Sequence, residues 1–145
     1  MNRTFVISVV VMFFVASLLG FVVHGLIIGG EYAKLTNLFR GEADFMQHYP
    51  AMAAANLLFA IGFTWIYRQG RENRPFLAQG IRFGLAVAVL ATIPTYLIYY
   101  AVQPMPSDVV ALQVVCDTIA MVVQGIIVAA INRDPASLRA PRASA

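Results

Sequence analysis

TFVISVVVMFFVASLLGFVVHGLIIGG, residues 4–30, is an apolar run interrupted only by isolated polar side chains such as Ser8 and His24. Its length of about 27 residues exceeds the about 20 that a helix needs to cross the hydrocarbon core of a bilayer. A secretory signal peptide has a shorter apolar core of about 7–15 residues that ends in a small-residue cleavage site. This run continues well past Ala16 and Ser17, so it predicts a transmembrane helix.

The rest of the 145-residue chain has the same apolar character. Hydrophobic residues make up 60% of it, charged residues 12%, and its mean hydropathy is +0.75. These values lie outside the range of soluble domains and predict an integral membrane protein of the all-α class, a four-helix bundle. A single transmembrane domain is expected at residues 1–132, with spans at 4–30, 50–67, 77–102 and 109–131, an outward loop at 31–49, a cytoplasmic loop at 68–76 and a disordered tail at 133–145.

Two prolines affect the helices predicted for the second and third spans. Pro50 is expected in the first turn of its helix, where a missing N–H is tolerated. Pro94 lies inside the third span and should kink it. Aromatic side chains that anchor spans at a membrane interface are expected at the ends of the second and third spans: Trp65, Tyr67, Tyr96, Tyr99 and Tyr100.

The basic residues predict the orientation of the spans. Eight of the ten fall in the N-terminal segment, around the 68–76 loop and in the tail, and only Lys34 and Arg40 fall elsewhere. Positive residues in short flanking segments are retained in the cytoplasm. Both termini are therefore expected inside, with the first and third loops outside the inner membrane of a bacterium.

The two halves of the chain share a pattern: a long span, an outward loop and a second span. The second spans end similarly, in Trp65-Ile-Tyr-Arg and in Ala130-Ile-Asn-Arg. One interpretation is a parallel two-helix repeat with its axis along the membrane normal. The other is that short spans generally end in an aromatic or polar residue followed by arginine.

Small residues at four-residue spacing predict helix packing. Gly25 and Gly29 form one such pair, which Gly20 extends along the same helix, and Gly80 and Gly84 form another. Small-xxx-small patterns let helix backbones approach closely, either within a chain or between chains. Packing within the chain is the favoured interpretation, with the closest approach expected at the first pair.

Polar residues inside the predicted spans are the candidate functional groups. Asp117 lies within the fourth span with Gln124 on the same side of the helix, while Asn56 and Thr64 are in the second span and His24 is in the first. Together they could line a polar path for an ion or solute. They could equally be interhelical hydrogen-bonding groups, which is the favoured interpretation because a carboxylate in hydrocarbon needs partners.

His24 and His48 could also ligate a haem or a metal ion. Their different depths and the absence of a further histidine or cysteine near them argue against a ligand set, so no metal or cofactor is expected. Cys116, the single cysteine, excludes an internal disulfide. The sequence has no phosphate-binding loop, nucleophile elbow, metalloprotease motif or nucleic-acid-binding motif, so no catalytic residue and no nucleic-acid partner is predicted.

Two segments carry a resemblance to known proteins: Gly62-Phe-Thr-Trp-Ile-Tyr-Arg-Gln-Gly and Gly80-Ile-Arg-Phe-Gly-Leu. With this aromatic-arginine end to the second span and glycine-rich start to the third, the chain resembles small, uncharacterised four-span proteins of the bacterial inner membrane. The resemblance implies a fold and a location but no activity.

Three functions are considered on this basis. The first is a non-catalytic accessory or assembly subunit that packs against a larger membrane complex or another copy of itself. The second is a small oligomeric transporter or channel that uses Asp117, Gln124 and His24. The third and least favoured is a haem-binding electron carrier.

The charge distribution gives a test of topology. Reporter fusions after Arg71 and after Asp134 should both report the cytoplasm, and a fusion after Arg40 should report the outside, because basic flanks resist translocation. An outside signal at either of the first two positions would contradict the predicted orientation.

Overall fold

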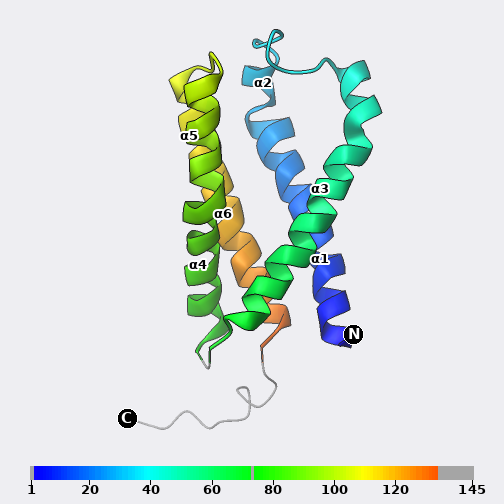
Figure 1. Cartoon of the computed structure of the whole chain (residues 1–145), viewed down its shortest axis with the longest axis vertical. Helices are drawn as coiled ribbons and strands as arrows, with labels where there is room; N and C mark the ends of the chain where they lie inside the picture. The colour runs from blue at the N-terminus through cyan, green and yellow to red at the C-terminus, as the bar shows by residue number, and fades with distance from the viewer. Residues whose placement is uncertain (1, 73, 134–145) are drawn as a thin grey trace.

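The computed structural model describes residues 2–72 and 74–133, and every regular element in these ranges is helical (Figure 1). The elements are, in chain order, α1 (Arg3–Gly20), the π-helical segment η1 (Phe21–Ile27), α2 (Gly29–Tyr32), α3 (Glu42–Gln69), α4 (Phe76–Val87), the π-helical segment η2 (Ala88–Thr92), α5 (Ile93–Val102) and α6 (Ser107–Ile131). The expected all-α class is therefore confirmed. The tail predicted to be disordered lies outside the described residues, except for Arg133.

Four continuous helices within the described residues are long and apolar enough to cross a membrane. They are Arg3–Ile27, Glu42–Gln69, Phe76–Val102 and Ser107–Ile131. Each has 25 to 28 residues, which at 1.5 Å per residue gives about 38 Å or more, against a hydrocarbon thickness of about 30 Å. The expected number of long apolar helices is confirmed. The spans pair in chain order: α1 lies against α3, α4 lies against α6, and α1 and α6 join the two pairs.

The second long helix starts eight residues before its predicted boundary. The segment 42–49 was expected in the outward loop, but α3 begins at Glu42, and Pro50 lies inside it rather than in its first turn. Acidic side chains near a helix N-terminus interact favourably with the helix dipole. Asp44 also pairs with Arg40 and His48, at i−4 and i+4. The polar residues of this segment therefore stabilise a helix that extends past the apolar stretch.

Pro94 affects the third long helix one turn before its own position. The proline ring crowds the carbonyl of Leu90 and cannot donate a backbone hydrogen bond. The helix there widens into η2, which ends at Thr92, and α5 starts with the proline near its first position. A second π-helical segment, η1, interrupts the first long helix around His24.

The closest approach between helices joins α4 to α6. A Cβ added at Gly80 would lie 2.6 Å from Cα of Ile126, and one added at Gly84 would lie 2.6 Å from Cα of Val122. Gly125 of α6 faces the same two glycines. Only hydrogen atoms fit between these backbones, as in other small-residue helix contacts.

The expectation that Gly25 and Gly29 mark the closest helix approach is wrong. A Cβ at Gly25 would meet the side chain of Phe21 in its own helix, and one at Gly29 would meet the carbonyl oxygen of His24. A Cβ added at Gly20 would meet no neighbouring atom of the described residues within 4 Å. Gly20 therefore faces open space, and Gly25 and Gly29 are crowded only by atoms of the helical turn that precedes each of them.

The end of the bundle near the N-terminus is closed by apolar packing. Met12 of α1, Phe63 and Tyr67 of α3, and Val128 of α6 form a buried cluster. Phe83 of α4 lies with its ring centroid 4.7 Å from that of Phe63. At the other end α3 stands apart, and every residue from 42 to 52 is exposed (Figure 1). The four helices are therefore closed at one end and open at the other.

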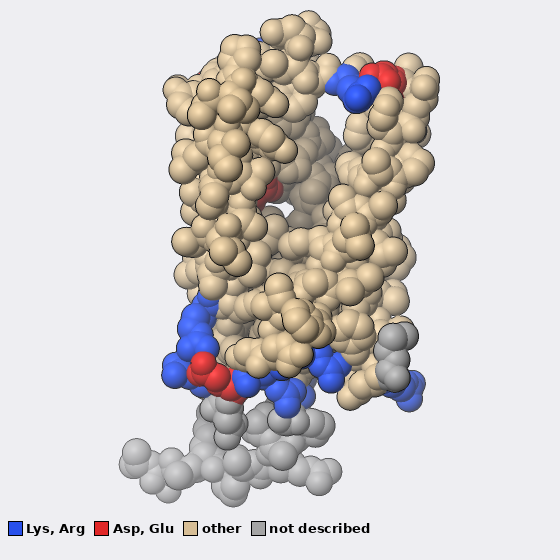
Figure 2. All heavy atoms as spheres, in the orientation of Figure 1, with Lys and Arg blue, Asp and Glu red and all other residues tan. Residues whose placement is uncertain are grey.

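Arginine side chains gather at the closed end, below the apolar part of the bundle (Figure 2). This end contains the start of α1, the turn between α3 and α4, and the end of α6. The Arg71 guanidinium donates a hydrogen bond to the backbone carbonyl of Asn132. The side-chain amide of Asn132 donates in turn to Ser8 Oγ, at 2.9 Å. These hydrogen bonds fasten three helix ends together.

The glycine contact gives a test of the fold. Gly84→Leu should lower the thermal stability of the purified protein strongly, because the first side-chain carbon already collides with the α6 backbone. Overpacking of this kind costs about 1–3 kcal/mol or more. Gly20→Leu is the matched control and should leave the melting temperature in detergent nearly unchanged. Equal melting temperatures for the two variants would contradict the assignment.

Candidate functional site

A cleft of about 960 Å³ opens between the diverging end of α3 and the rest of the bundle. Its walls come from α1 and η1, α3, η2 and α5, and α6. This volume is at the upper end of the range for small-molecule sites, about 300–1,000 Å³. Figure 2 shows the hollow, with an acidic side chain visible deep inside it. Asp117 is the acidic residue that lines the cleft.

Small side chains keep the cleft open. Gly20 and Gly25 lie on the wall formed by the first helix, and Ala16, Ala55 and Ala91 lie on the walls around it. A larger side chain at any of these positions would occupy part of the space. Two of the glycines predicted to pack helices therefore line the cleft.

Asp117 joins three helices in the wall of the cleft. Its Oδ2 lies 3.3 Å from Nε2 of His24, which is on η1. The same oxygen accepts a hydrogen bond from the hydroxyl of Tyr96, on α5. The side chain of Asp117 is 13% exposed and that of His24 is 37% exposed. The pair is thus partly screened from solvent and reaches the cleft surface.

A second hydrogen bond holds the other side of the imidazole. Nδ1 of His24 lies 2.9 Å from the hydroxyl of Tyr32, which follows η1 on the short helix α2. The side-chain amide of Gln113 donates to that hydroxyl at 2.8 Å. Burial raises the pKa of Tyr32, so this hydroxyl stays protonated at neutral pH. Gln113, Tyr32, His24, Asp117 and Tyr96 form one connected network, referred to here as the Asp117 network.

The network bears on the haem and metal hypothesis. Both ring nitrogens of His24 have partners, so ligation there would require one of these contacts to break. His48 lies on the exposed start of α3 and contacts Asp44 of its own helix. The described residues contain no group of three or more histidine, cysteine or acidic side chains that could hold a metal ion.

The other predicted polar residues separate into two groups. Asn56 and Gln124 line the cleft with His24 and Asp117. Asn56 donates to Ser17 Oγ at 3.2 Å, which joins α3 to α1. Thr64 is fully buried in α3, away from the cleft lining. Four of the five candidate residues therefore share one surface.

The sequence pattern did not single out Tyr32, Tyr96 and Gln113 as site residues. It predicted an interfacial anchor at Tyr96 and placed Tyr32 in the outward loop. Gln113 carried a usable signal, since it precedes Asp117 by four residues and so lies on the same face of a helix. The contacts of the two tyrosines depend on how α2 and α5 pack against α6, which residue spacing alone does not show.

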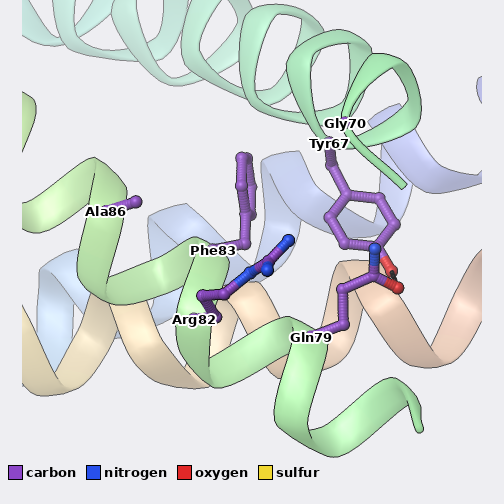
Figure 3. A pocket seen from close by; sticks show the side chains of 6 residues that line it. All are labelled: Tyr67, Gly70, Gln79, Arg82, Phe83 and Ala86. Atoms are coloured by element: carbon purple, nitrogen blue, oxygen red, sulfur yellow. Dashed lines mark hydrogen bonds between the residues drawn. The ribbon is translucent and has the colours of Figure 1, made fainter. Parts of the chain in front are cut away.

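A second, smaller cavity of about 160 Å³ lies at the arginine-rich end (Figure 3). Tyr67 from α3 and Gln79 from α4 point toward each other, 3.2 Å apart, and Arg82 extends beside Phe83. Arg82 and Arg74 both pair with Glu72. The hydrogen bond from Arg82 is the main cause of a lowered pKa at Glu72. These groups satisfy one another and fasten the turn between α3 and α4.

Comparison with protein-family models, with curated proteins and with solved structures finds no match for this chain. The chemistry of the cleft is therefore the basis on which a function can be proposed.

The hydroxyl of Tyr96 should contribute measurably to stability. Tyr96→Phe removes one donor from a partly buried carboxylate, which costs about 1–2 kcal/mol. We expect a lower melting temperature in detergent for this variant. Tyr99→Phe, which changes an exposed tyrosine of the same helix, is the control and should melt like the wild type. If both variants match the wild type, the Tyr96 hydroxyl does not support Asp117.

Proposed function

We propose that this chain is an integral membrane protein of the bacterial inner membrane with both termini in the cytoplasm. The four membrane-length helices support the location. Figure 2 supports the orientation, because arginine side chains gather at the end where α1 begins and α6 ends. At the opposite end Lys34 and Arg40 pair with Glu31 and Asp44, at 2.7 and 2.8 Å, which offsets their charge. The positive-inside rule then assigns the arginine-rich end to the cytoplasm.

Within that membrane we propose that the protein is a small transporter that binds an amphipathic solute in the cleft. The observation that carries this proposal is the Asp117–His24 pair on the wall of a 960 Å³ cleft. An ionisable side chain inside a membrane costs about 2.5 kcal/mol or more, and such residues mark substrate or ion paths when they face a cavity. Around the pair the walls are mostly apolar, which suits a solute with one polar end.

We propose carriage rather than chemical conversion. The polar groups of Asp117 and His24 contact each other and two tyrosine hydroxyls, so their contacts serve to position and stabilise charge. Serine, threonine, asparagine and glutamine side chains contribute the other polar groups of the lining, without a further charged group. This arrangement resembles a solute-binding surface more than a catalytic one.

Vesicles that contain the purified full-length chain provide the test. They are loaded with three fluorescent amphipathic solutes of different charge: ethidium, methylumbelliferyl glucoside and anilinonaphthalene sulfonate. At least one should leave faster than from protein-free vesicles. Ala91→Trp, which fills the cleft, should return that rate close to the protein-free value, while Leu90→Trp changes an exposed position outside the cleft lining and should not. Equal rates with and without wild-type protein would overturn the transporter proposal.

The accessory-subunit hypothesis has one structural observation in its favour. The start of α3 is exposed at every residue from 42 to 52 and stands away from the bundle (Figure 1). A helix of a partner protein or of a second copy could pack beside it. Purification in mild detergent would then recover a stoichiometric partner or a stable oligomer. Vesicles that contain the protein would transport none of the three solutes.

The parallel-repeat hypothesis also gains support. In each half the first span contains a π-helical segment, η1 or η2, and the second span, α3 or α6, is continuous. Each first span also makes a side-chain hydrogen bond to its own second span, Ser17 with Asn56 and Tyr96 with Asp117. We propose that the halves are two copies of one helical hairpin.

A further inference from the structure

We infer that the cleft selects a solute carrying a protonated amine, which binds the Asp117 carboxylate. This inference rests on the proposed function and names the chemical class of its solute. It depends on three features of the described residues: the hydrogen bonds of His24, a cleft lining that contains Asp117 but no arginine or lysine, and the aromatic side chains of that lining.

The Asp117 network favours a neutral His24. The Gln113 amide donates to the oxygen of the Tyr32 hydroxyl, which leaves the hydrogen of that hydroxyl to be donated to Nδ1 of His24. An imidazole that accepts at Nδ1 carries its own hydrogen on Nε2. That hydrogen then points to Oδ2 of Asp117, 3.3 Å away. With the hydrogens arranged in this way, the imidazole is neutral.

A neutral His24 leaves the charge of Asp117 uncompensated. Hydrogen bonds from the imidazole and from Tyr96 stabilise the carboxylate but bring no positive charge. Arginine and lysine side chains are not part of the cleft lining. The cleft therefore has a net negative charge, and a cation would be attracted to it.

Gln124 adds an acceptor without a donor. Its side chain is 4% exposed and lines the cleft, yet Oε1 lacks a hydrogen-bond partner among the described residues. A buried polar atom of this kind costs about 1–3 kcal/mol. Gln124 follows Asp117 by seven residues, two turns along the same face of α6. Seven residues correspond to about 10 Å along the helix axis, so Gln124 is an acceptor for another donor group of the solute and not a second partner of the same ammonium.

Aromatic rings provide the remaining surface. Phe21, Phe45, Tyr49, Phe59 and Tyr96 line the cleft and come from η1, α3 and α5. Their faces attract cations, and their area buries the apolar part of a ligand. A hydrophobic amine therefore satisfies the carboxylate and the aromatic wall together.

Three compounds with the same ring and different charge test the inference. Naphthylmethylammonium, naphthylmethanol and naphthylacetate are dialysed at pH 7 against the full-length chain in nanodiscs of neutral lipid, with protein-free nanodiscs as reference. The ammonium compound should bind at least about tenfold more tightly than the alcohol, because its hydrogen bonds are charge-assisted. The anion should bind most weakly.

Variants of α6 locate the selectivity. Asp117→Asn should reduce the affinity for the ammonium compound to about that for the alcohol. Asp108→Asn removes a carboxylate from the exposed first turn of the same helix and should leave all three affinities unchanged. The ranking of the three compounds on the wild type needs no variant, so it tests the inference even if a substitution prevents folding.

Equal binding of the three compounds, or tightest binding of naphthylacetate, would overturn the inference. The second outcome would mean that His24 is charged. An unchanged ammonium preference in Asp117→Asn would also overturn it. Because binding is measured without flux, selective binding without transport would refute only the transporter, and transport without ammonium selectivity would refute only this inference.

Discussion

The backbone contact between α4 and α6 determines where the other helices can lie. Gly80 and Gly84 on one helix and Gly125 on the other remove every side chain from the contact, so the two backbones approach to the limit of their own atoms. Dispersion forces fall steeply with distance, and such a contact is therefore a strong source of helix association where apolar burial provides little. It makes α4 and α6 the fixed pair of the bundle.

The position of the Asp117 network follows from that pair. Beyond the glycines the third long helix passes through η2 and continues as α5, which still lies against α6. Tyr96 of α5 can then reach Asp117 of α6. The widening at η2 lies close before Pro94, so a proline that removes one backbone hydrogen bond also adjusts the direction from which a tyrosine approaches a carboxylate.

The helices pack differently at the two ends of the bundle. At the arginine-rich end, the apolar cluster around Met12 and Phe63 and the hydrogen bonds of Asn132 hold four helices together. At the other end α3 leaves the bundle, and small residues such as Gly20 and Ala91 line the space it leaves. Asp117 lies at this open end, where it has hydrogen-bond partners and lines the cleft. Such a division lets one part of a small protein be rigid while another part stays accessible.

The sequence by itself determined the helical class, the number of long apolar helices and the gathering of arginines at one end of the bundle, because these follow from composition and from the position of basic residues between apolar runs. It also identified Asp117, His24, Gln124 and Asn56 as unusual, since polar groups in apolar runs are rare. Hydropathy placed the start of α3 too late, because ion pairs extend that helix beyond its apolar stretch.

Only the tertiary structure decided which glycines bring helices together and which leave space. Gly25-xxx-Gly29 and Gly80-xxx-Gly84 are equivalent as patterns, yet only the second meets a facing glycine, Gly125. The tertiary structure also brought Tyr32, Tyr96 and Gln113 to the site. The physical reason is the same in both cases: a residue's spacing shows which face of its own helix it occupies, whereas its partner depends on how separate helices pack.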